Sequence, residues 1–240
     1  MVTFTDLMDD AALLSFEHQL RMMDVVGLAA WSLDLDEPRF DLIGDERTLT
    51  TGDVQLLGTA APGPQSWLWS WANPGTYRPD VLAVALRARE FGEKHGVAEL
   101  AEPEVPFASL PGSPTEPAVV ASYMMEAAKA ATGWYTGYQG PVGDAGTRIG
   151  LLLRHPELSL PAPEGPRVSR VLQQGLTELR FGDQRRGVHA YGRRRDGLEV
   201  MHSGDVTRIT GPDSLTIDLR FDDLNRFTAM SAHLGGSKTP

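Results

Sequence analysis

The chain has 240 residues, a formal net charge of −10, and 41% hydrophobic and 22% charged residues. This length allows one large domain with a small second part, and the composition excludes global disorder. The absence of cysteine excludes disulfides, thiol nucleophiles and cysteine-ligated metal sites. Because no apolar run of about 20 residues and no export signal occurs, we expect a soluble, cytoplasmic protein.

The charge is unevenly distributed along the chain. Residues 1–166 contain 10 lysines and arginines against 23 aspartates and glutamates, whereas residues 167–240 contain 12 against 9. The acidic part would repel nucleic acid and could attract a basic protein partner. Solubility and attraction between the two parts are the alternative explanation. We therefore predict no nucleic-acid partner, and the lack of a spanning segment predicts no membrane association.

The beginning of the chain predicts a helix followed by strands. Apolar residues recur at helical spacing from Leu7 to Val25, and Gly27 is a plausible end. The period then changes to two, which predicts strands at 31–35 and 39–43. Later runs at 53–60 and 66–72 also have strand character. We interpret these segments as an antiparallel meander of about four strands.

Two further helices are predicted in the middle of the chain. Pro79 suits a first helical turn, and Gly96 suits the position after the last one. Residues 99–112 are interpreted as a loop rich in glutamate and proline. The Ser-Pro-Thr-Glu sequence at 113–116 then predicts a capped start, and Gly133 the end, of the next helix.

The remaining sequence predicts a strand, a linker and a smaller subdomain. A glycine-rich aromatic loop at 134–146 precedes a buried strand at 149–153, and both belong to a first domain of residues 1–155. Four prolines predict an extended linker at 156–166. Residues 167–236 are predicted to form a helix, at 168–180, and hairpins docked on the first domain, because so short a piece rarely folds alone. Residues 237–240 are a tail.

These elements together predict the α+β class. The expected order is an N-terminal helix, the antiparallel meander, two helices, a returning strand and a small C-terminal unit of one helix and hairpins.

The most distinctive segment contains three tryptophans at alternate positions, 67, 69 and 71. In a strand, Trp67, Trp69 and Trp71 would share one face. Such a row could form the wall of a pocket for an apolar ligand or a partner, or it could be a core face covered by helices. The candidate binding residues are therefore Trp67, Trp69, Trp71, Asn73, Tyr135 and Tyr138.

The sequence Trp-Leu-Trp-Ser-Trp-Ala-Asn-Pro at 67–74, after a Leu-Leu-Gly strand and before a helix, resembles the signature of an uncharacterised bacterial domain family. Members share a helix, a sheet carrying the motif, further helices, and a loop with tyrosine, glycine and proline comparable to 135–141. The resemblance covers about residues 10–155. It implies a domain of unknown function with this fold and carries over no activity.

A polar cluster is predicted in the second part. If Asp196-Gly197 forms a type I′ turn, the hairpin pairs Tyr191 with His202 and places His189 and Arg193 on the same face. Two imidazoles, a phenol and a guanidinium could bind an anion or transfer a proton. A half-exposed sheet face without function is the alternative.

Motifs for the common enzyme classes are missing. The six histidines show no His-x-x-x-His spacing, and neither Gly-x-Ser-x-Gly nor a phosphate-binding glycine loop occurs. We assign no catalytic residue, metal or cofactor. The first hypothesis is a non-enzymatic binding protein that neutralises a basic partner, as immunity proteins do, or binds a small apolar molecule. The alternative is a small-molecule enzyme with His/carboxylate acid–base chemistry in an α+β cavity.

Overall fold

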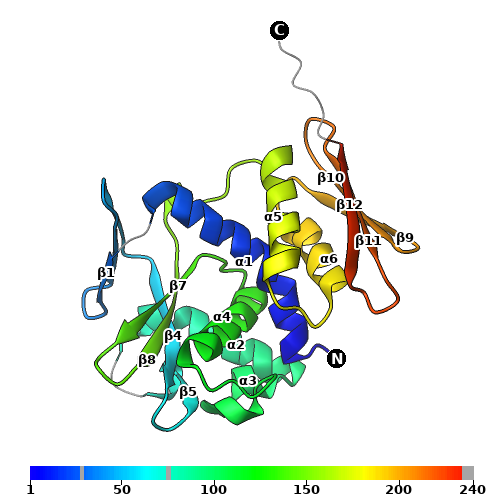
Figure 1. Cartoon of the computed structure of the whole chain (residues 1–240). Helices are drawn as coiled ribbons and strands as arrows, with labels where there is room; N and C mark the ends of the chain where they lie inside the picture. Colours follow the sequence, from blue (N-terminus) through cyan, green and yellow to red (C-terminus); the bar gives the residue numbers. More distant parts are fainter. Residues whose placement is uncertain (28–29, 74–76, 234–240) are drawn as a thin grey trace. The chain divides into compact units, whose positions relative to one another are not determined.

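The computed structural model describes residues 1–27, 30–73 and 77–233, and it shows two compact units. The first unit comprises Met1–Leu7 and His18–Ser159. The second comprises Met8–Glu17 and the chain from Leu160 onward. Helix α1 (Phe4–Val26) therefore contributes residues to both units (Figure 1). The predicted tail at 237–240 lies outside the described residues.

Helix α1 begins with a capping box, in which the Thr3 hydroxyl accepts from the Asp6 N–H and the Asp6 carboxylate accepts from the Thr3 N–H. These bonds satisfy backbone donors that a helix start otherwise leaves without partners. The helix ends at Gly27, whose φ of 78° favours glycine. The predicted first helix is confirmed.

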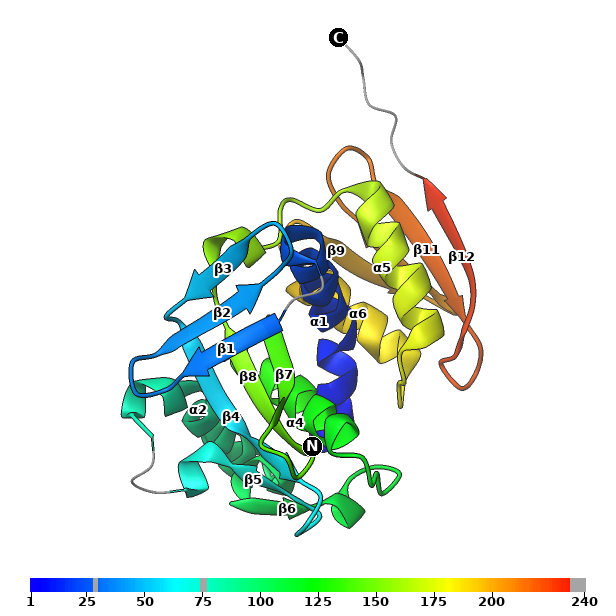
Figure 2. The ribbon, with the colours of Figure 1, turned by 60° about the vertical axis from the view of Figure 1, so that its left-hand side comes forward.

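The principal sheet of the first unit has five antiparallel strands in the order β6-β5-β4-β8-β7 (Figure 2). Its strands are β4 (Val54–Ala61), β5 (Ser66–Trp69), β6 (Glu104–Pro106), β7 (Gly137–Val142) and β8 (Thr147–Leu153). The central pair, β4 and β8, is formed by segments almost a hundred residues apart.

A separate three-stranded sheet precedes it, with the order β1-β2-β3. It contains β1 (Ala30–Asp34), β2 (Arg39–Ile43) and β3 (Thr48–Thr51). The predicted α+β class is confirmed, but the strands predicted as one meander are divided between two antiparallel sheets, and the prediction missed β3. That strand is short, and three of its four residues are threonines. Because Leu49 is its only apolar residue, it lacks the apolar alternation on which strand prediction depends.

The first unit is layered around the principal sheet. Helices α2 (Pro79–His95) and α4 (Pro117–Thr132) pack against β4 and β8. The alternate side chains Val54, Leu56 and Leu151 of the same strands form a core with Phe40 and Leu42 of the small sheet. Figure 2 shows the small sheet and the two helices on opposite sides of the principal sheet.

Both predicted middle helices exist, but one start was misplaced. Helix α2 has Pro79 in its first turn and Gly96 in the left-handed conformation at its end, as predicted. Helix α4 ends at Gly133 as predicted, yet it begins at Pro117, not near Ser113. The Ser113 hydroxyl instead donates to the Ala108 carbonyl in the preceding turn. A serine can bond a nearby carbonyl as readily as it can cap a helix.

Two segments interpreted as loops contain regular structure. Residues 99–112 include part of the short helix α3 (Ala98–Ala101), the strand β6 and the 3-10 turn η2 (Phe107–Ser109). The glycine-rich segment 134–146 contains β7, which pairs with β8 as a hairpin. Strand β6 escaped prediction because its ladder is made with β5, which lies far away in the sequence, and the glycines of β7 gave it the composition of a loop.

The second unit combines part of α1 with two helices and a four-stranded antiparallel sheet. Its helices are α5 (Gly165–Glu178) and α6 (Gln184–Arg194), and its sheet has the order β12-β11-β10-β9. The strands are β9 (Glu199–Ser203), β10 (Val206–Thr210), β11 (Thr216–Phe221) and β12 (Phe227–His233). The helix predicted at 168–180 is confirmed as α5.

The predicted hairpin around Asp196-Gly197 is wrong. Gly197 does form a tight turn with φ of 83°, but the residues before it belong to helix α6. This helix buries Gly187, Val188, Ala190, Tyr191 and Gly192, and its two buried glycines disfavour a helix when the sequence is considered locally. At Gly192, a Cβ would come within 2.7 Å of Val200 Cβ, so the glycine allows the helix to approach β9 closely.

Among the helices of the described segments, none combines the length and the apolar character needed to cross a membrane.

Candidate functional site

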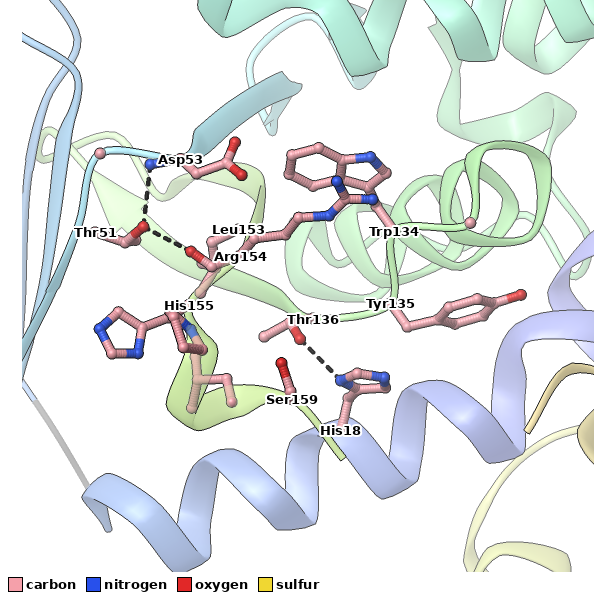
Figure 3. Close-up of a pocket in the computed structure, with 14 residues that line it drawn as sticks. His18, Thr51, Asp53, Trp134, Tyr135, Thr136, Leu153, Arg154, His155 and Ser159 are labelled. Carbon is pink, nitrogen blue, oxygen red and sulfur yellow. Dashed lines mark hydrogen bonds between the residues drawn. The ribbon is translucent and has the colours of Figure 1, made fainter. Parts of the chain in front are cut away.

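A pocket of about 760 Å³ opens in the first unit, next to the end of β8 (Figure 3). A volume of this size is typical of small-molecule sites. Its lining comes from four separate segments, listed here: His18, Thr51, Gly52, Asp53, Gly133, Trp134, Tyr135, Thr136, Leu153, Arg154, His155, Pro156, Leu158 and Ser159.

Backbone hydrogen bonds hold these segments together. The Thr51 hydroxyl donates to the Arg154 carbonyl at 2.6 Å and accepts from the Asp53 N–H at 3.0 Å. The Leu153 N–H donates to the Thr136 carbonyl, and the Arg154 N–H to the Asp53 carbonyl. Two sides of the pocket are therefore fixed at the ends of the central strands β4 and β8 of the principal sheet, as a preorganised site requires.

Arg154 is the principal charged group of the pocket. Its guanidinium carbon lies 3.9 Å from the centroid of the Trp134 ring, and Figure 3 shows the two groups stacked. The Trp134 ring is 6% exposed, so it is a fixed platform. Stacking orients a guanidinium but leaves the N–H donors on its edge available to an anion. Asp53 also lines the pocket, yet within the described residues no carboxylate forms an ion pair with Arg154.

A second polar group comes from helix α1. His18 Nδ1 lies 2.8 Å from the Thr136 hydroxyl oxygen, and the His18 ring stacks on Tyr135 with centroids 6.1 Å apart. These contacts fix the imidazole on the side of the pocket opposite Arg154 (Figure 3).

The third polar group, His155, follows Arg154 in extended backbone, so the two side chains point to opposite sides. Its Nδ1 accepts from the Glu157 N–H at 3.2 Å and caps the 3-10 turn η3 (Pro156–Leu158). Pro156 and Leu158 add apolar surface next to it. The pocket therefore combines an apolar wall with imidazole, hydroxyl and guanidinium groups.

The structure places Trp67 and Trp69 in the core. Both are 0% exposed, and their rings meet edge to face at 5.6 Å. A Cβ on Gly58 or on Gly150 would come within 2.8 Å of the Trp67 ring, so the indole lies directly on the backbone of β4 and β8. The Trp69 indole N–H donates to the Glu99 carbonyl. Neither ring offers surface to a ligand.

The third tryptophan does not share their face. The predicted strand 66–72 ends at Trp69, and residues 70–72 form the 3-10 turn η1 (Ser70–Ala72). The buried Ser70 hydroxyl donates to the Leu56 carbonyl at 2.6 Å, which turns the backbone out of strand geometry. Trp71 is half-buried, with the Arg89 guanidinium 4.5 Å from its ring centroid. The row of three indoles therefore does not exist.

The other candidates of the first unit are dispersed. Asn73 follows η1, and its N–H donates to the Ser70 carbonyl. Pro74, the last residue of the motif, lies outside the described residues. Tyr138 packs with Trp31 and Phe40 between the two sheets, where burial raises the pKa of its phenol. Of the six candidates, Tyr135 alone lines the pocket.

The predicted polar cluster is assembled in part. His189 Nδ1 lies 2.5 Å from His202 Nε2, although the two residues are on α6 and β9 rather than on one hairpin. Tyr191 points away from them: it is 1% exposed, and its hydroxyl donates to Glu17. Burial and the Glu17 carboxylate raise the pKa of Tyr191 far above its ordinary value. Arg193 lies near His189. Burial is the main cause that lowers the pKa of the His189 imidazole, and the charge of Arg193 lowers it further.

Sequence reasoning missed most of the pocket. His18, Asp53, Trp134, Arg154 and His155 have no motif spacing because they come from distant segments. One available signal was Arg154-His155-Pro156, a guanidinium and an imidazole directly after a buried strand at the start of a proline-rich segment. Polar residues at strand ends are common positions for binding sites.

Fold and site together define an α+β protein in which an open pocket with apolar and polar walls lies at the end of a central strand of an antiparallel sheet. The chain belongs to the family of unknown function DUF6882, whose model matches residues 5–156. This match confirms the predicted membership in a family without assigned activity, and it includes nearly every pocket residue. No curated protein and no solved structure matches the chain.

Proposed function

We propose that this protein is a non-enzymatic binding protein whose ligand is a small organic anion held in the pocket of the first unit. The observation that carries the proposal is Arg154, a guanidinium stacked on a buried indole and without an ion-pair partner among the described residues. Arginine held in this way is suited to bidentate binding of a carboxylate or phosphate.

The rest of the pocket supports an amphipathic ligand. Tyr135, Pro156 and Leu158 present apolar surface, while Thr136 and Ser159 present hydroxyl groups. A ligand with an anionic group at Arg154 could place an apolar ring against this surface. The expected ligand is therefore anionic, in place of the apolar molecule predicted for the tryptophan face, because Trp67 and Trp69 are fully buried.

The test compares matched charged and neutral compounds. Binding of benzoate and indole-3-acetate, with their amides as neutral counterparts, is measured by isothermal titration calorimetry on the full chain. We expect the carboxylates to bind and the amides to bind at least tenfold more weakly, since a charge-assisted hydrogen bond contributes about 1.5–3 kcal/mol.

The variant Arg154→Gln should lose the preference for carboxylates. Arg89→Gln is the matched control, because Arg89 also stacks on a tryptophan, Trp71, but does not line the pocket. The proposal fails if neither carboxylate binds, or if Arg154→Gln binds both as tightly as the unmodified chain.

A further inference from the structure

We propose that the second unit contains a separate site for a tetrahedral oxyanion of the phosphate type, formed by His189, His202 and Arg185. These residues line a cavity of about 360 Å³ together with Asp183, Arg186 and Asn225. The cavity is distinct from the pocket of the first unit and shares no residue with it.

The two imidazoles face each other through their ring nitrogens. His189 Nδ1 and His202 Nε2 are 2.5 Å apart, the ring centroids are 4.6 Å apart, and the planes differ by 25°. His202 Nδ1 lies 2.9 Å from the Thr207 hydroxyl oxygen. A contact this short requires one proton between the nitrogens, with one ring as donor and the other as acceptor. Full protonation of both rings would break it.

Burial and the neighbouring arginines favour the neutral form of the pair. Burial is the main cause that lowers the pKa of both imidazoles; Arg193 and Arg186 lower that of His189 further, and Asp10 opposes them. For His202, the charges of His189 and Arg185 act in the same direction. The pair therefore carries less positive charge near neutral pH than two free histidines would.

Arg185 supplies a cationic donor to the cavity. It donates to the Gly204 carbonyl at 2.6 Å, and within the described residues no carboxylate forms an ion pair with it. Arg186, in contrast, is paired with Asp10 at 2.7 Å. The Asp183 carboxylate is engaged as the N-cap of α6, accepting from the Arg186 N–H and from the Asn225 amide. The cavity therefore presents the Arg185 guanidinium and N–H donors, while the one carboxylate among its described lining residues, that of Asp183, already accepts hydrogen bonds from the protein.

This arrangement fits an anion better than a metal ion. Among the described residues, no group of three or more histidine, aspartate or glutamate side chains is placed to hold a metal, and the neighbouring arginines repel cations. A bound dianion would favour a second proton on the pair, and each imidazole could then donate to an oxyanion oxygen. Anion binding should therefore strengthen as the pH falls.

The experiment uses sulfate as the probe, because its charge is constant between pH 5.5 and 7.5. Binding to the full chain is measured by calorimetry at constant ionic strength, with acetate as a planar comparison. We expect saturable sulfate binding that is several-fold tighter at pH 5.5, and weaker binding of acetate. Phosphate should bind at least as tightly as sulfate.

Two variants and a control complete the test. Arg185→Gln should weaken sulfate binding about tenfold at both pH values, and the double variant His189→Gln/His202→Gln, which removes both imidazoles, should abolish the pH dependence. The control Arg220→Gln removes an exposed arginine of the same unit that pairs with Asp205 outside the cavity, and it should bind normally. Absence of saturable binding, equal binding of acetate, or unchanged affinity in Arg185→Gln would each overturn the proposal.

Discussion

Replacing Trp67 by alanine should strongly destabilise the first unit. The side chain is fully buried, and it lies over Gly58 and Gly150, where the sheet has no side chains of its own to fill a void. Truncation of a large buried aromatic residue costs about 3–5 kcal/mol. Because the Trp67 indole N–H has no partner among the described residues, no hydrogen bond is lost, and the full cost arises from packing.

Urea unfolding followed by tryptophan fluorescence measures this cost selectively. All five tryptophans lie between residues 31 and 134, so the emission reports on the first unit alone. With a dependence on urea of about 2 kcal/mol per molar, the midpoint should fall by about 2 M in Trp67→Ala. The four remaining indoles retain the signal.

The neighbouring position provides the control. Leu68 points to the other face of β5 and is 36% exposed, so Leu68→Ala should cost less than about 1 kcal/mol. If Trp67→Ala shifts the midpoint no more than Leu68→Ala does, the assignment of Trp67 to the core is wrong.

Three further outcomes are expected. Glu17→Ala should destabilise the second unit by about 3–5 kcal/mol in circular dichroism, because it leaves the buried Arg195 guanidinium without its counter-charge. Burial raises the pKa of Asp9 from 3.8 to about 6. Since the folded state then binds the proton more tightly, the stability relative to Asp9→Asn should fall by about 2 kcal/mol between pH 4 and pH 7, and parallel pH profiles would contradict this. Gly140→Val should cost about 1–3 kcal/mol in fluorescence-detected unfolding, since a Cβ there would be 2.5 Å from the Trp31 ring.

Helices with clear ends were the most predictable elements. Pro79, Gly96 and Gly133 act through local geometry, as first-turn proline and left-handed glycines, and neighbouring structure does not change their effect. Local geometry also explains why Trp67 and Trp69 share a face, because side chains alternate between the two faces in any strand. The prediction failed at Ser70, whose hydrogen bond to the Leu56 carbonyl depends on a partner from another strand.

The pocket and the cavity were less predictable because each is assembled from distant segments. His18 and Arg154 line the same pocket although more than a hundred residues separate them in the sequence. No local sequence pattern encodes this proximity. His189 and His202 were named together for a wrong reason: the hairpin does not exist, and α6 brings them into contact through glycines that allow close packing. The local sequence identified His189 and His202 as candidates, whereas the contact between them depends on the tertiary structure.

The division of helix α1 has a consequence for synthesis of the chain. Residues Met8–Glu17 belong to the second unit, whose remaining residues begin at Leu160. At about 5–20 residues per second, the ribosome needs roughly ten to thirty seconds to make the intervening segment. During that interval Glu17 lacks Arg195, and the apolar side chain of Leu13 lacks α5, against which it packs at Gly175. The nascent chain therefore exposes an apolar, acidic helix segment that a chaperone could bind until translation is complete.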